Sequence, residues 1–280
     1  MAYEPFVGFG TRKGIVYALD EYGLPLGTYV ADVYGVAQPT TDPYVGLEIY
    51  GIRSFEVTYP EPRRIPHFNG DRVELVQQFP SLDAAAGTIV VDGADLNLAS
   101  VLGNVQKSTI SGMELMPHMT DKQGSEPSVG LLVYQAAKKS TGVTGWHFHF
   151  IQSTTMIPRP GPFGDNNYET RYALAPNAVS QMPWGFALDP DVNGASSAGV
   201  IEGWSLQPPR VTSWVADGVE TDFLFDEDLQ PPDNTYTVYR AIAGVVSEVT
   251  SGITKTTTGI EFAVAPADNA KILVPHVINI

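Results

Sequence analysis

The sequence predicts a mainly β protein, in which a sandwich- or barrel-type domain with one short helix precedes a second, smaller β unit. The 27 glycines and 22 prolines are scattered at short intervals along the 280 residues. The segments between them are rich in Val, Ile, Thr, Tyr and Phe, which favour strands, and helical periodicity is almost absent. We therefore expect many short strands joined by turns.

Residues 1–205 are expected to form the larger domain. Its first residues, 1–14, are glycine-rich and without a hydrophobic stripe, so they are expected to form a flexible amino-terminal arm. A proline-rich loop is expected at residues 158–162. The expected strands cover residues 52–58, 88–91, 130–136, 145–153 and 168–174.

A long loop is expected at residues 59–82, because prolines and a glycine punctuate this stretch. Loops of this length without secondary structure are uncommon in compact domains and usually serve a function. This loop is the most basic part of an acidic chain, so it is a candidate for contact with the acidic surface of a neighbouring copy. A mobile surface loop is the alternative. The candidate contact residues are Arg63, Arg64, His67 and Arg72.

The one good helix candidate begins near Asp95. Leu96, Leu98 and Leu102 lie at spacings that a helix brings to one side. Gly103 follows as a terminator, so the helix is expected to have only two or three turns.

A domain boundary is expected near residues 205–210, where Gln207-Pro208-Pro209 interrupts the strand pattern and cannot continue a central strand. Residues 206–280 then form a second unit, a small β-sandwich of the immunoglobulin-like type. Its short alternating strands are expected at residues 236–240, 252–258, 259–263 and 271–274.

The chain carries 16 basic and 31 acidic residues, a net charge of −15. This imbalance repels phosphate backbones, so specific nucleic-acid binding is disfavoured, although a wall that does not bind DNA suits a conduit for it. The alternative is that the acidity serves only solubility. Cysteine is absent, which excludes disulfides and suits folding in a reducing cytoplasm. No export signal or membrane span is recognised, so no membrane partner is expected.

Catalytic signatures are missing. The sequence has no Gly-x-Ser-x-Gly elbow, no phosphate loop and no His-Glu-x-x-His zinc helix. The glycines between Gly8 and Gly14 have the wrong spacing for a dinucleotide fingerprint. We therefore expect no catalytic residue and no cofactor, and predict that the protein is not an enzyme.

Two histidines alternate with aromatic residues in residues 146–150. A strand would send Trp146 and the two phenylalanines to one face and both His147 and His149 to the other. Two imidazoles on one face can bind zinc or copper if a third ligand, His118 or a carboxylate, comes from elsewhere. The alternative, favoured because no third ligand stands at a recognisable spacing, is two polar residues on an outer face.

Residues 189–194 match the opening of a calcium loop, in which Asp189, Asp191 and Asn193 would bind the ion. The match then fails, because Val200 takes the place of the bidentate glutamate and Glu202 comes two residues late. An acidic turn is therefore favoured over calcium, and no bound metal is expected.

An acidic cluster in the second unit resembles the paired carboxylates of glycosidases only in residue type. General acid catalysis needs a carboxyl whose pKa is raised by burial, whereas this stretch is bordered by turn residues. Solvated charge is the favoured interpretation. The cluster comprises Asp222, Asp226, Glu227, Asp228 and Asp233.

Taken in order, a strand, a long loop, a strand, a short helix and strands around a second loop make the first two hundred residues resemble the tail tube protein of long-tailed bacteriophages. The later module, above all residues 259–266 and 271–274, resembles the small β domains that phage virion proteins append at their carboxyl ends. The residues that carry the first resemblance are 51–58 with the loop to Leu82, 87–91, the helix at 95–102, 146–153 and 168–174.

The resemblance implies a virion protein that assembles with copies of itself. Hexameric rings would stack into the tail tube, with the loop at residues 59–82 contacting the adjacent ring. Viral DNA would pass through the lumen without specific binding, other phage tail proteins would be partners, and assembly would take place in the host cytoplasm. Two alternatives stay open: another virion component, such as a capsid decoration or head-to-tail joining protein, and a carbohydrate-binding or hydrolysing β-sandwich protein.

Overall fold

The computed structural model describes the chain in stretches that include all of residues 200–279. Over these stretches the protein is mainly β, with a barrel and additional sheets, as the sequence predicts. No helix among them is long and apolar enough to cross a membrane. The described residues are 6–26, 43–58, 63–69, 72–79, 86–93, 98, 102, 108–111, 113–115, 128–160, 169–176 and 200–279.

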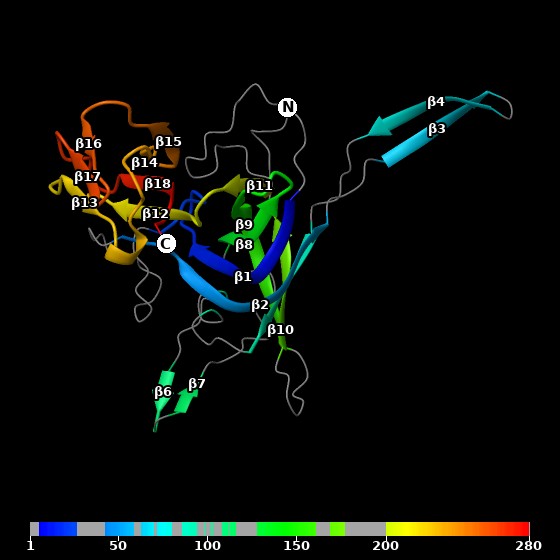
Figure 1. Cartoon of the computed structure of the whole chain (residues 1–280), viewed down its shortest axis with the longest axis horizontal. Helices are drawn as coiled ribbons and strands as arrows, with labels where there is room; N and C mark the ends of the chain where they lie inside the picture. The colour runs from blue at the N-terminus through cyan, green and yellow to red at the C-terminus, as the bar shows by residue number, and fades with distance from the viewer. Residues whose placement is uncertain are drawn as a thin grey trace.

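The strands are numbered in chain order, and Figure 1 labels most of them. In the larger part they are β1 Phe6–Ala18, β2 Leu47–Thr58, β3 Arg63–Asn69, β4 Arg72–Phe79, β5 Ala86–Asp92, β6 Ser108–Ile110, β7 Met113–Leu115, β8 Val129–Lys139, β9 Thr144–Pro160, β10 Glu169–Pro176 and β11 Val200–Ser205. The carboxyl-terminal part holds β12 Pro209–Val215, β13 Asp222–Leu224, the 3₁₀ turn η2 Glu227–Leu229, β14 Tyr239–Ile242, β15 Val245–Glu248, β16 Ile253–Lys255, β17 Gly259–Phe262 and β18 Lys271–Val277.

Six antiparallel strands close into a barrel in the order β10-β5-β2-β1-β8-β9, because β9 pairs back onto β10. The length of β9 makes this closure possible. Its first half pairs with β8, and its residues from Thr154 onward pair with β10. The first half of β9 also pairs with β11, which is thereby attached to the barrel. A closed ring leaves none of these six strands as an open sheet edge along its whole length.

The barrel interior is filled by an aliphatic core to which all six strands contribute, for example Val16, Ile89 and Ile151. The period-two alternation of a strand places Leu131 of β8 in this core and Leu132 in a second core outside the barrel. Fully buried Leu98 and Leu102 also belong to the interior core, and both are helical. The helix prediction is confirmed at these two residues, and the rest of residues 95–104 lies outside the described part.

The carboxyl-terminal unit consists of two sheets that enclose a third core. One sheet has the order β12-β18-β14-β15 and the other β13-β17-β16. Trp214 is fully buried between them and makes edge-to-face contacts with Phe223 and Phe225. A small β-sandwich is therefore present, as predicted, while its immunoglobulin-like type and a domain boundary at residue 205 stay predictions. The sequence placed its strands correctly at residues 259–263 and 271–274, but β14 begins only at Tyr239 and β16 covers only 253–255.

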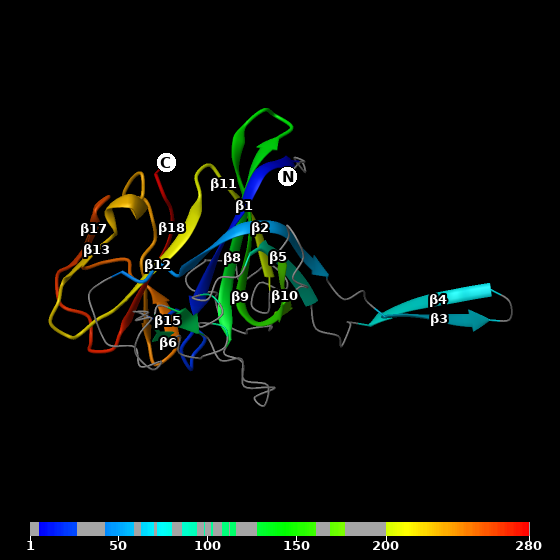
Figure 2. The ribbon, with the colours of Figure 1, turned by 90° about the horizontal axis from the view of Figure 1, so that it is seen from below.

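The second core joins the barrel to the carboxyl-terminal unit, which lie side by side in Figures 1 and 2. Barrel residues such as Tyr17 and Leu132 pack there with Val211 of β12 and Leu273 of β18. Tyr44 adds a short backbone bridge to Ser213, in which each N–H donates to the other residue's carbonyl at 2.8 and 3.0 Å. The two units therefore share buried apolar surface, which the sequence pattern alone did not indicate.

A buried ion pair crosses the same junction. Arg210 of β12 is almost fully buried and donates to the carboxylate of Glu48 on β2, which also accepts a hydrogen bond from the hydroxyl of Tyr50. Burial by itself would raise the pKa of Glu48, but the hydrogen bonds from Tyr50 and Arg210 outweigh it and the pKa is lowered. Glu48 is therefore ionised at neutral pH and compensates the buried guanidinium.

Replacing Glu48 by Gln is expected to destabilise the protein by about 2 kcal/mol, because it leaves the buried charge of Arg210 without its counter-ion. Glu48 is itself partly exposed, which keeps the loss below that of a fully buried pair. Urea unfolding of Glu48→Gln beside Glu56→Gln, an exposed carboxylate on the same strand, measures the difference. A Glu48→Gln variant as stable as the Glu56→Gln control would contradict this role of the pair.

The flexible arm predicted at residues 1–14 is wrong from Phe6 onward, because Phe6–Ala18 forms β1, a barrel strand between β2 and β8. The glycines suggested flexibility, but backbone pairing holds the segment in the sheet, with Phe6 opposite Lys139 of β8 and Ala18 opposite Val129. Residues 7–10 are exposed, so no hydrophobic stripe in the sequence marked this part as a strand. Residues 1–5 lie outside the described part.

The loop predicted at residues 59–82 is wrong at residues 63–69 and 72–79, which form the β3–β4 hairpin, and the rest of this range lies outside the described residues. The overlooked signal is Gly70-Asp71, a dipeptide typical of two-residue hairpin connections, since the pairing of Asn69 with Arg72 leaves these two residues between the strands. Pro66 pairs with Val76, and it is tolerated because each strand of a two-stranded ribbon has an outer edge that needs no donor.

The loop predicted at residues 158–162 is wrong at residues 158–160, because β9 continues to Pro160, and residues 161–162 lie outside the described part. Beyond Thr154 the pairing with β8 has ended, and β10 is the one described neighbour of β9. Pro158 and Pro160 pair with β10 at Tyr172 and Thr170. The missing N–H groups of the prolines are acceptable in a strand that has one open side.

Candidate functional site

The β3–β4 hairpin extends away from the rest of the molecule, as Figures 1 and 2 show from two directions. It forms a two-stranded sheet of its own, in which Arg63 pairs with Phe79 at one end and Asn69 with Arg72 at the other. All four contact residues predicted from the sequence belong to it: Arg63, Arg64 and His67 to β3, and Arg72 to β4. The structure thus places these four residues on one projecting element.

Strand β11 lies at the edge of the barrel sheet, with β9 as its one neighbour among the described strands. The outer edges of β3 and β4 are likewise not paired with another described strand. An edge presents backbone N–H and C=O groups to which a strand of another chain can add. The edge of β11 and the β3–β4 hairpin are therefore the candidate assembly surfaces.

A cluster of two histidines and a glutamate lies where β9 meets β11. The predicted alternation on β9 is confirmed, because the aromatic Phe148 and Phe150 pack in the second core while the imidazoles take the opposite face. That face is not an outer, solvated one as favoured from the sequence, because both histidines are partly buried and His149 packs against the ring of Phe55 at 5.3 Å.

The third member of the cluster is Glu202 of β11, whose Oε1 lies 2.7 Å from Nε2 of His147. Burial lowers the pKa of His149, and the neighbouring His147 lowers it further, against an opposing effect of Glu202. His149 is therefore neutral at pH 7. Sequence reasoning considered Glu202 only as a late calcium ligand, since the strand character of β11 was not recognised. The apolar and aromatic residues Val200, Ile201 and Trp204 were the available signal.

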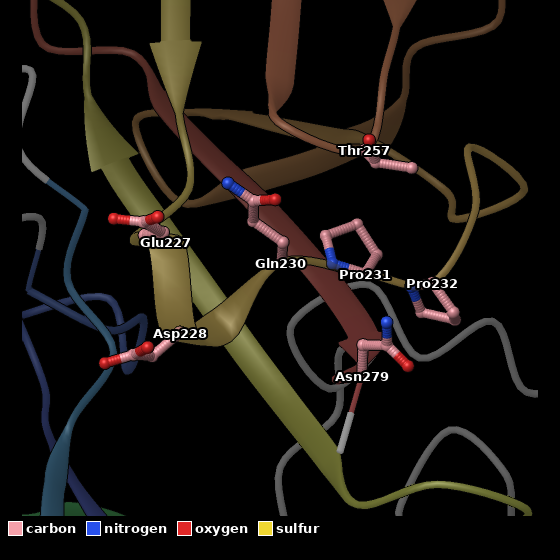
Figure 3. A pocket seen from close by; sticks show the side chains of 7 residues that line it. All are labelled: Glu227, Asp228, Gln230, Pro231, Pro232, Thr257 and Asn279. Atoms are coloured by element: carbon pink, nitrogen blue, oxygen red, sulfur yellow. The ribbon is translucent and has the colours of Figure 1, made fainter.

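The acidic cluster of the second unit does not converge on a catalytic geometry. Glu227 and Asp228 lie at the rim of a polar pocket of about 290 Å³, and in Figure 3 their carboxylates point away from Pro231 and Pro232 on its other side. Asp233 accepts hydrogen bonds from the backbone and hydroxyl of Thr235, which lower its pKa. A lowered pKa is the opposite of what a general acid needs.

Asp189, Asp191 and Asn193, the calcium candidates, and His118 lie outside the described residues. Among the described residues, the group that brings three metal-binding side chains together is that of His147, His149 and Glu202. Comparison with protein-family models, with curated proteins and with solved structures finds no match for this chain.

Proposed function

We propose that the protein is a structural subunit of a phage virion, a tail tube protein whose working form is a polymer of identical chains. The observation that carries the proposal is a closed barrel from which the β3–β4 hairpin projects. In this proposal hexameric rings stack into a tube, and the protein acts by assembly and not by catalysis.

The hairpin supports the proposal because a two-stranded ribbon is only marginally stable on its own in water. Among the described strands, β3 and β4 pair only with one another. A ribbon of this kind gains stability when it packs on or pairs with another chain, which a ring or a stack of rings supplies many times over. Contact between the hairpin and the adjacent ring is therefore the proposed interface.

Charge supports the same arrangement. The hairpin sequence contains three arginines against the two acidic residues Asp71 and Glu74, while the chain as a whole has a net charge of −15. Such a segment is attracted to the acidic body of another copy, and the attraction is screened by salt. The acidic body also disfavours tight binding of DNA, as a tube through which DNA slides requires.

The carboxyl-terminal sandwich fits as an appended module on the outside of the ring. It packs against the barrel through the second core, while the β3–β4 hairpin extends from the opposite side of the molecule in Figure 1. The module therefore leaves the hairpin free to reach a neighbouring subunit.

Mass photometry of the purified protein tests the proposal. The expected result at low salt is a species of six times the 30.2 kDa of one chain, together with larger stacks that shrink as salt is raised. A trimer, pentamer or dodecamer would favour a capsid decoration or joining protein instead. A single species of one chain mass at all concentrations and salt levels would reject assembly altogether.

A further inference from the structure

We propose that His147, His149 and Glu202 form a binding site for a divalent transition-metal ion such as Zn²⁺, which locks β11 onto β9. One potential ligand atom from each residue lies within 4.8 Å of the other two. This inference is independent of self-assembly, because the three residues come from one chain.

The strand ladder positions the three side chains. His147 and His149 are two residues apart on β9 and so project from the same face. Glu202 lies directly opposite His149 in the antiparallel pairing of β11 with β9, which puts their side chains next to each other. At the next position Gly203 has no side chain, and the ring of Phe148 occupies that space, so β11 lies close against β9.

The ligand chemistry suits zinc or a related ion. Two imidazoles and one carboxylate are a ligand set of zinc sites that keep a fourth position open, in which ligand atoms around a tetrahedral ion lie about 3.3 Å apart. The ligand atoms lie within 4.8 Å of one another, so binding requires side-chain rotations that bring them closer together. The hydrogen bond between His147 and Glu202 already holds two of the ligands together at 2.7 Å.

A buried nitrogen atom without a hydrogen bond is a second observation that supports a bound ion. Nδ1 of His149 is buried and makes no hydrogen bond in the structure. A buried polar atom without a partner is costly and rare in folded proteins. The hydrogen bond between His147 and Glu202 leaves this cost in place, whereas coordination of a metal ion by Nδ1 of His149 would remove it.

Three protein ligands leave a further coordination position open. The side chain of Glu202 is 54% exposed and that of His147 18%, so this position faces solvent and is available to water. The structural consequence of binding is a cross-link between β9 and β11, the strand directly before the carboxyl-terminal sandwich. Metal binding is therefore expected to stabilise the junction of the two units.

Calorimetric titration of the full chain with ZnCl₂, after treatment with a chelator, tests the proposal. Wild-type protein is expected to bind one Zn²⁺ per chain, and its melting temperature is expected to rise by about 5 °C when free zinc is a hundredfold above Kd. Glu202→Gln and His149→Gln are each expected to weaken binding at least about tenfold and to remove most of the rise. Glu248→Gln, an exposed carboxylate on β15, is the matched control and is expected to bind like wild type.

Titration with Co²⁺ adds a readout that surface binding does not give. Coordination by the cluster is expected to produce visible absorption bands that Glu202→Gln lacks and Glu248→Gln keeps. The proposal is overturned if Glu202→Gln and His149→Gln, still folded by circular dichroism, bind zinc as tightly as wild type, or if wild type binds none. Since the measurement is made on dissociated chains at high salt, neither outcome depends on whether tubes form.

Discussion

Deleting the β3–β4 hairpin is expected to leave a folded, monomeric protein that no longer forms rings or tubes. The change replaces residues 63–79 by a short Gly-Ser linker between β2 and β5, which pair directly with each other in the barrel. Each of the three cores contains residues of several strands that the deletion keeps, so the barrel and the sandwich are expected to survive. Sedimentation velocity measures the loss of assembly, and circular dichroism confirms the fold.

Charge-changing variants of the hairpin test whether its positive charge, and not only its presence, is needed for assembly. The triple variant Arg63→Glu, Arg64→Glu, Arg72→Glu is expected to weaken assembly at least about tenfold, because like charges then face an acidic partner. The matched variant with lysine at the three positions keeps the charge and is expected to retain assembly, more weakly where an arginine makes a bidentate contact. If the deletion variant assembled as the wild type does, the hairpin would not be part of the interface.

Lowering the pH from 7 to 5 is expected to cost the protein about 2 kcal/mol of stability through His276 alone. Burial lowers the pKa of this β18 histidine from 6.5 to about 4, and the positive charge of Arg210 acts in the same direction. Its Nδ1 lies 3.2 Å from the Val277 carbonyl, which can only accept, so Nδ1 donates there; Nε2 lies 2.9 Å from the hydroxyl of Thr212, which can donate to a neutral ring. This tautomer gives both nitrogens of the neutral imidazole a partner, and the neutral ring is the form that burial favours.

The direction of the effect follows from proton uptake. In the unfolded chain His276 gains a proton below about pH 6.5, whereas in the folded state it stays neutral down to about pH 4. The unfolded state therefore binds more protons in this window, and the stability present above pH 6.5 is lost as the pH falls. Urea unfolding at pH 7 and pH 5 measures this loss.

The variant His276→Gln isolates the contribution, because glutamine does not titrate. His149, whose pKa is also lowered by burial, acts in the same direction and remains in both proteins. The variant is expected to be less stable at pH 7 but to lose about 2 kcal/mol less than wild type between pH 7 and pH 5. Equal losses in the two proteins would show that His276 is not held neutral in the folded state.

The fold class could be predicted from the sequence because strand-forming segments are recognised from neighbouring residues alone. Residues 130–136 contain a run of apolar and aromatic side chains and residues 145–153 alternate aromatic with polar ones, and both segments lie within β8 and β9 as expected. Proline and glycine misled the interpretation at β1, at the hairpin and at the end of β9. A strand can contain these residues when it is paired with another strand or has an open edge that needs no backbone donor. Both conditions depend on tertiary structure, so a local sequence pattern does not show them.

The same limit applies to the histidine cluster. The faces of Trp146 to Phe150 follow from period-two alternation, and the structure confirms them. The partner Glu202 is 55 residues from His147 in sequence and reaches it only through the register of β11 on β9. Register depends on tertiary pairing, so no spacing rule in the sequence identifies this third side chain. The shared core around Tyr17 and Val211 was missed for the same reason.

Electron microscopy of the negatively stained protein, concentrated at low salt, tests the central claim most directly. The account predicts rings of six subunits that stack into hollow tubes, because the projecting hairpin and the edge of β11 are completed by neighbouring copies. Isolated, monodisperse particles of single-chain size under all conditions would contradict it.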